Sequence, residues 1–141
     1  MFTVAVILAA ELCVCKQTFP VGLRFYAFVL LLLIWATMRC DDIQGVDPSS
    51  FVLSQIGAKL VGNLYGYIGR GVGLTGYDWL SEGQRLLRAE VLCRKRDYFC
   101  VGFSEDWTIP QDGFLEPEGV AVHLRRLMLA LKVPTDRKSV V

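Results

Sequence analysis

The chain has 141 residues, of which 53% are hydrophobic and 21% charged, and fifteen basic against fourteen acidic side chains leave a net charge of +1. This charge excludes a nucleic-acid-binding domain that is basic throughout, because such domains have a pI above about 9. Any contact with DNA therefore requires a local cluster of cations. A chain of this length forms one core, and its apolar content exceeds the roughly 45–50% of soluble domains.

Five cysteines, at positions 13, 15, 40, 93 and 100, lie mostly inside apolar stretches. This odd number and spacing do not form a disulfide framework and favour a reducing compartment, the nucleus or the cytoplasm. Cys13 and Cys15 could form half of a metal site, which needs four ligands. The chain has one histidine and no second pair at a suitable spacing, so we expect no metal and no cofactor.

Two apolar segments open the chain. Residues 3–16 carry apolar side chains at helical spacing and predict a mostly buried helix that ends before Pro20. Residues 22–38 predict a second helix, apolar nearly all round, as in a helix surrounded by others. Its apolar run, 25–38, is shorter than the roughly 20 residues that cross a bilayer. We expect a buried helix, and the alternative is a membrane hairpin of 1–15 and 25–38.

The middle of the chain predicts a short helix and a small antiparallel sheet. Asp41 or Asp42 is placed to cap a helix that ends near Val46. Residues 51–64 then predict two short strands with a turn between them, and 65–68 continue the sheet.

The remaining residues predict two helices separated by a long connection. The first begins at Thr75 or Asp78 and runs to about Arg94. An extended segment, 97–101, and a polar loop follow, and the last helix begins at Pro117.

The fold class is therefore mainly α with a small antiparallel sheet, an α+β domain. Its expected parts are an N-terminal helix (1–20), a segment with the hairpin (21–64), a helical remainder (65–133) and a frayed tail (134–141).

Arg39 stands at the end of the long apolar helix, in the segment IWATMRCDDIQGVDP. Asp42 follows three positions later. Ile43 and Val46 supply apolar residues at four and seven positions, before the expected hairpin at 51–64. This order resembles the first conserved box of the tyrosine-recombinase, or phage-integrase-like, catalytic domain. The segments YIGRGVGLTGYDWLSEGQRLL and RDYFCVGFSEDW also resemble integrase-like sequences of eukaryotic mobile elements.

The resemblance implies DNA recombination or integration, with DNA as the partner. In that family an arginine binds the phosphate whose charge grows during attack by a tyrosine, since a guanidinium offers two parallel donors. The resemblance gives this role to Arg39 and a supporting role to Asp42. Lys59, on a strand, is a weaker candidate for the family's lysine.

His123 and Arg126 spell the family's His-x-x-Arg motif and lie on one helical face, which we expect to be solvated. No tyrosine follows them, so the nucleophile is missing. We therefore expect a truncated fragment that is inactive in strand exchange and retains weak binding of DNA phosphates.

Arg94, Lys95 and Arg96 form the densest basic cluster, and Arg85 and Arg88 lie one or two turns earlier on the same expected helix. Such a ridge could contact nucleic-acid phosphates. It could equally be the solvated C-terminal end of a helix, where cations are favoured.

The segment GVGLTG, at 71–76, has the spacing of a dinucleotide-binding loop. That loop requires a buried parallel strand before it, and the preceding Tyr-Gly-Tyr is a poor one, so we do not expect a nucleotide site of this kind. A third reading of the chain is an interaction module whose exposed apolar surface binds a protein partner.

Overall fold

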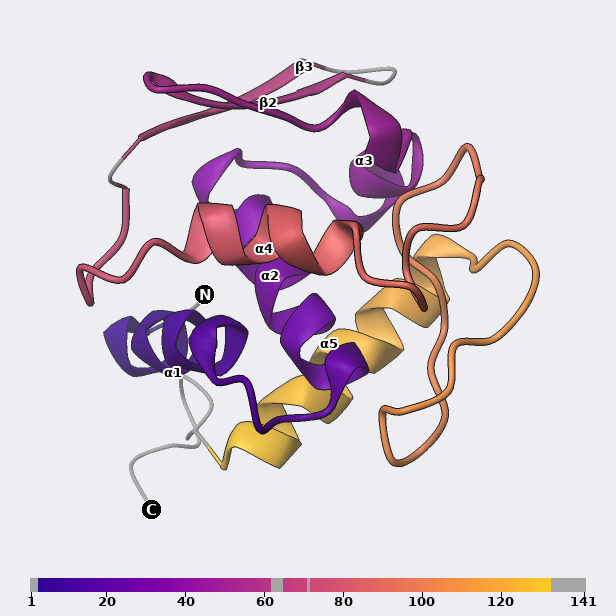
Figure 1. Cartoon of the computed structure of the whole chain (residues 1–141). Helices are drawn as coiled ribbons and strands as arrows, with labels where there is room; N and C mark the ends of the chain where they lie inside the picture. The colour runs from indigo at the N-terminus through magenta and orange to yellow at the C-terminus, as the bar shows by residue number, and fades with distance from the viewer. Residues whose placement is uncertain (1–2, 62–64, 71, 133–141) are drawn as a thin grey trace.

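The computed structural model describes residues 3–61, 65–70 and 72–132. Its elements in chain order are α1 (Val4–Cys15), α2 (Val21–Trp35), α3 (Cys40–Gln44), the 3-10 helix η1 (Pro48–Ser50), β1 (Val52–Leu53), β2 (Gly57–Val61), β3 (Tyr65–Gly69), α4 (Trp79–Leu87) and α5 (Pro117–Leu131). The sheet lies at the top of Figure 1, with the helices below it. The expected α+β class is confirmed.

Helix α2 forms the centre of the core. Every residue from Gly22 to Leu33 is buried, and α1, α4 and α5 all pack against it. The expected buried helix is confirmed, although it ends at Trp35 and not at Met38. Thr37 adopts a left-handed conformation (φ 53°), and the Met38 N–H donates to the Leu33 carbonyl at 3.0 Å. This closure is typical of a helix C-terminus.

No helix in the described part of the chain is both long and apolar enough to cross a membrane. Helix α1 agrees with its expected range, and Thr3 caps its first turn by accepting a hydrogen bond from the Val6 N–H.

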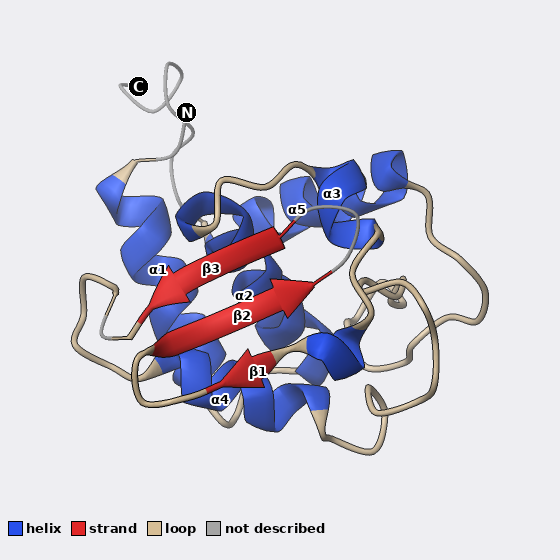
Figure 2. Cartoon of the chain, turned by 90° about the horizontal axis from the view of Figure 1, so that it is seen from above, coloured by secondary structure: helices blue, strands red, loops and turns tan. Residues whose placement is uncertain are grey.

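The three strands form an antiparallel sheet in the order β1-β2-β3. Lys59 on β2 pairs with Val52 on one side and Tyr67 on the other. All three side chains are exposed, whereas Ala58 and Leu60 are buried. This alternation is that of a sheet with one face on the core. Figure 2 looks onto the sheet, with the helices behind it. The expected hairpin and its continuation are confirmed.

Helix α3 begins differently from expectation. Its N-cap is Arg39, and neither aspartate takes that position. The Asp42 carboxylate reaches back and accepts a hydrogen bond from the Arg39 N–H at 2.9 Å. An acidic residue in the first turn satisfies the free amide from inside the helix, as in the second half of a capping box.

Helix α4 begins as expected, because the Asp78 carboxylate accepts from the Ser81 N–H. It ends at Leu87, and the expected extension to Arg94 is wrong. In a continued helix the Leu92 carbonyl would accept from the Arg96 N–H. It accepts instead from Arg96 Nη1, at 2.7 Å. The loop therefore folds around the Arg96 guanidinium.

The expected extended segment 97–101 does not join a strand ladder. The buried Gln44 side chain takes the place of a neighbouring strand: its Oε1 accepts from the Cys100 N–H at 2.6 Å, and its Nε2 donates to the Cys100 carbonyl at 3.1 Å. A buried amide side chain thus satisfies both polar groups of one backbone position.

Helix α5 begins at Pro117, as expected, and buries Val120, Leu124 and Leu127. The expected end at Pro134 and the tail 134–141 lie outside the described residues.

Candidate functional site

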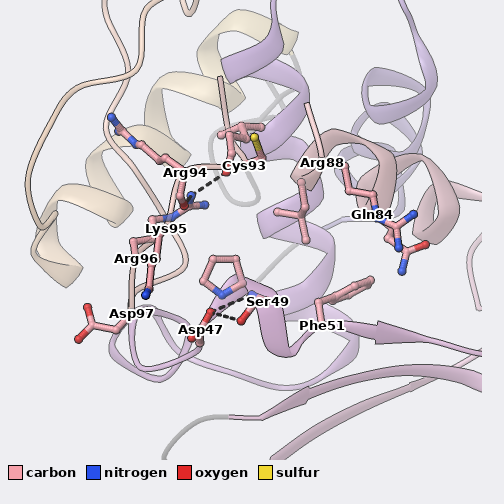
Figure 3. A pocket seen from close by; sticks show the side chains of 13 residues that line it. Asp47, Ser49, Phe51, Gln84, Arg88, Cys93, Arg94, Lys95, Arg96 and Asp97 are labelled. Carbon is pink, nitrogen blue, oxygen red and sulfur yellow. Dashed lines mark hydrogen bonds between the residues drawn. The ribbon is translucent and has the colours of Figure 1, made fainter. Parts of the chain in front are cut away.

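An open cavity of about 860 Å³ lies between the end of α4, the loop that follows it and η1 (Figure 3). We call it the basic cavity. It is lined by Asp47, Pro48, Ser49, Phe51, Gln84, Leu87, Arg88, Leu92, Cys93, Arg94, Lys95, Arg96 and Asp97. In Figure 3, Gln84 on α4 and Arg88, which directly follows α4, lie on one side of it, and the 93–97 loop lies on the other.

Positive charge is concentrated in the basic cavity. It contains four of the five cations expected to bind nucleic acid, together with two carboxylates. The lining residues therefore sum to two positive charges, or to one when the pairing of Arg94 with Asp112 is counted, in a chain whose net charge is +1. The fifth cation, Arg85, does not line the cavity and instead forms an ion pair with Glu82.

Two of these cations hold the loop in place. Arg96 is 9% exposed, and its guanidinium donates to the carbonyls of Leu92, Arg94 and Phe99. Burial, reinforced by the charge of Arg94, lowers the pKa of Arg96 from its ordinary value. Arg94 donates to the Asp112 carboxylate at 2.9 Å. Both cations therefore stabilise the loop, and both guanidinium groups already donate to groups of the chain.

Arg88 and Lys95 are different. Both side chains are exposed, and neither makes a hydrogen bond or ion pair with another residue that the structure describes. Arg88 directly follows α4 and Lys95 lies in the loop, and the two residues are on opposite sides of the basic cavity (Figure 3). They are the cations in the cavity that are available to an anionic ligand.

Asp47 lies at the bottom of the basic cavity in Figure 3, which we call its floor, and hydrogen bonds within the chain hold its carboxylate. Asp47 accepts from the Ser49 hydroxyl at 2.7 Å and from the Ser49 N–H at 2.8 Å. These hydrogen bonds lower the pKa of Asp47 from its ordinary value, because they favour the charged form.

Arg39 lies outside this cavity. Its side chain is 78% exposed, with Nε 3.5 Å from an Asp42 oxygen and Nη2 3.7 Å from an Asp41 oxygen. Two carboxylates thus neutralise the guanidinium, and a phosphate would have to compete with them. The catalytic role that the resemblance gives to Arg39 and Asp42 stays a prediction.

His123 is buried, so the prediction that it lies on a solvated face of its helix is wrong. Its Nε2 accepts from the Phe103 N–H at 3.0 Å, its Nδ1 lies 2.8 Å from the Gly119 carbonyl, and its ring stacks on Tyr26. The reason is its position on α5, three residues after the buried Val120. Both ring nitrogens are occupied, so His123 fixes the packing of α5 against α2.

Arg126, which completes the His-x-x-Arg spelling, also has structural contacts. Its Nη2 donates to the Ser104 carbonyl at 2.8 Å, and its guanidinium lies 4.2 Å from the Trp107 ring centre. The pair therefore anchors the loop before α5. Lys59 lies on the outer face of β2, and its expected role stays a prediction.

Glu11 lies outside the basic cavity, and sequence reasoning missed its structural role. It is fully buried, and its carboxylate accepts from the Leu74 N–H, the Thr75 N–H and the Thr75 hydroxyl at 2.6–3.1 Å. The donors of the glycine-rich loop, which would otherwise suit a phosphate, therefore bind a carboxylate of the same chain. A lone acidic residue in an apolar helix was the available signal.

Comparisons with protein-family models, with curated proteins and with solved structures give no match for this chain. The relationship to tyrosine recombinases stays a prediction that rests on the residues around Arg39. The protein partner expected on exposed apolar surface also stays a prediction.

The cysteines differ strongly in environment. Burial raises the pKa of Cys13 to about 12 and that of Cys100 well above its ordinary value. Cys93 is exposed and lines the basic cavity. Because the thiolate is the reactive form, a thiol reagent applied to the folded protein should modify Cys93 ahead of the two buried thiols.

Proposed function

We propose that this chain binds the phosphate backbone of nucleic acid through the basic cavity and does not catalyse strand exchange. The observation that carries the proposal is the placement of Arg88 and Lys95, exposed and without ion-pair partners in the described part of the chain, on opposite sides of a cavity with excess positive charge. Cations that converge on a phosphate release its counterions, which drives association. A guanidinium adds a bidentate hydrogen bond.

The proposal is limited to binding because the cavity lacks the groups for phosphoryl transfer by a tyrosine. No tyrosine is among the residues that line it. Both ring nitrogens of His123 are occupied by the backbone. A phosphate held here would therefore lack both the nucleophile and the histidine that strand exchange requires.

A second, more specific proposal is that the chain descends from a tyrosine-recombinase catalytic domain. It is supported by the order of Arg39, Asp42 and the following sheet, and by the contact of the Asp42 carboxylate with both the N–H and the guanidinium of Arg39. It implies that Arg39 contributes a second phosphate contact. An Arg39→Gln variant tests this part separately.

The main test is a double variant, Arg88→Gln with Lys95→Gln. We expect its affinity for a labelled oligonucleotide to fall about tenfold at low salt, since two charge-assisted contacts are lost and about 1.4 kcal/mol is a factor of ten. Fluorescence anisotropy, repeated over a range of salt concentrations, measures the affinity. The dependence on salt should also become weaker, because fewer counterions are released.

Arg125→Gln is the control for the single variant Arg88→Gln, because each removes one exposed arginine charge. Arg125 lies on α5 and outside the basic cavity, whereas Arg88 lines it. Circular dichroism should show that all variants fold. A loss of affinity in Arg125→Gln equal to that in Arg88→Gln alone would mean that binding follows overall charge, and would contradict the proposal.

A further inference from the structure

The basic cavity has an apolar part as well as cations. Pro48, Phe51, Leu87 and Leu92 contribute to its lining. Phe51, Leu87 and Leu92 are at most 9% exposed, so half-buried Pro48 is the apolar group that a ligand offering only phosphates would leave uncovered. A ligand with both a charged group and a flat apolar group would use the whole cavity.

We infer that the basic cavity takes an unpaired nucleotide, with its phosphate between Arg88 and Lys95 and its base against the apolar lining. The inference rests on the proposed function and deepens it, since it names single-stranded nucleic acid as the ligand. In a duplex the base faces are covered by their neighbours. Only an unpaired base can turn its face to a protein surface.

The volume of the cavity fits this ligand. About 860 Å³ lies within the roughly 300–1,000 Å³ that is usual for small-molecule sites. The residues come from three segments: η1, the end of α4 and the loop after it. The cavity is therefore a concave site, whereas a duplex backbone requires only an extended surface.

Gln84 adds a group that can contact a base edge. It lies on α4, four residues before Arg88, and lines the cavity. Its side-chain amide makes no hydrogen bond to another residue that the structure describes. An amide both donates and accepts, so it can pair with the edge of any base.

The two carboxylates set the position of the phosphate. Asp47 is held at the floor by Ser49, and Figure 3 shows the Asp97 carboxylate turned away from the centre of the cavity. A phosphate is repelled by Asp47 and less by Asp97, which points away. The phosphate therefore lies above the floor, between Arg88 and Lys95.

The test compares three labelled ligands of equal length: a single-stranded oligonucleotide, the corresponding blunt duplex, and an abasic single strand that keeps the phosphates. We expect the intact single strand to bind the full-length protein about tenfold more tightly than the abasic strand, as loss of base stacking requires. The duplex should also bind more weakly than the intact strand. Fluorescence anisotropy at one salt concentration gives all three affinities.

Two variants separate the contributions of the base and the phosphate. Arg88→Gln should weaken the intact and abasic strands by the same factor. Pro48→Ala should weaken only the intact strand. Because Pro48 is half-buried in the short η1, its replacement can also disturb η1. Gln84→Ala lies on α4 and leaves η1 unchanged, and it should likewise weaken only the intact strand.

The outcomes are distinguishable. Equal affinity for intact, abasic and duplex ligands would overturn the unpaired-nucleotide inference and leave phosphate binding in place. Absence of binding to all three would overturn the proposed function as well. A tenfold preference for the intact strand that Pro48→Ala and Gln84→Ala both leave unchanged would place the base elsewhere and would also overturn the inference.

Discussion

A Glu11→Leu variant is expected to lose about 3 kcal/mol of unfolding free energy, because a buried donor left without an acceptor costs about 1–3 kcal/mol. Three donors lose their partner: the Leu74 N–H, the Thr75 N–H and the Thr75 hydroxyl. They are only partly buried, so water compensates some of the loss. Urea unfolding followed by tryptophan fluorescence measures the difference.

Glu11→Gln is the matched control. The side-chain oxygen of glutamine can replace Oε1, which accepts all three hydrogen bonds, whereas Oε2 accepts only from Leu74. We therefore expect less than half of the loss seen with leucine. Replacement of a buried charge by an apolar side chain can also stabilise a protein. A leucine variant as stable as the wild type would show that the loop does not depend on this carboxylate.

The second large effect is expected for Gly83→Ala on α4. Alanine favours a helix over glycine by about 1 kcal/mol, so propensity alone predicts a gain in stability. The structure predicts the opposite sign, since an added Cβ would lie 2.0 Å from Phe28 Cε1. Overpacking costs about 1–3 kcal/mol, and so close a contact belongs at the upper end of this range. After the gain in propensity we expect a net loss of about 2 kcal/mol in the same unfolding measurement.

A Phe28→Leu background identifies the cause of this loss. Phe28 is fully buried, and its ring also contacts Phe51 and Trp79, so the single variant is itself destabilised. In that background Gly83→Ala should cost much less, because the clashing ring is absent. An equal cost in both backgrounds would mean that contact with Phe28 is not what requires glycine at position 83.

Much of the fold follows from local pattern. Helical spacing predicts α1, α2 and α5. Cap chemistry predicts a start of α4 at Thr75 or Asp78, of which Asp78 is the cap, and a start of α5 at Pro117. These features depend on residues within one turn of each other. The end of α4 does not, because it is determined by a loop folded around the Arg96 guanidinium. Residue spacing carries no information about that loop.

The candidate site likewise has features that the local sequence predicts and features that only the fold reveals. The Arg94-Lys95-Arg96 cluster is visible in the sequence, and so is Arg88. Which of these cations is available depends on distant partners, such as Asp112 for Arg94. The floor of the cavity comes from Asp47 and η1, more than forty positions before the Arg94-Lys95-Arg96 cluster. Pairings between remote segments appear only once the fold is known.

The most direct test of phosphate binding in the basic cavity uses Cys93, which lines it. A saturating single-stranded oligonucleotide should slow the reaction of Cys93 with a thiol reagent, followed by mass spectrometry of the modified peptide. The same concentration should have little effect in the Arg88→Gln, Lys95→Gln variant. A bound oligonucleotide that leaves the rate at Cys93 unchanged in the wild type would contradict the claim, because the ligand would then lie elsewhere on the protein.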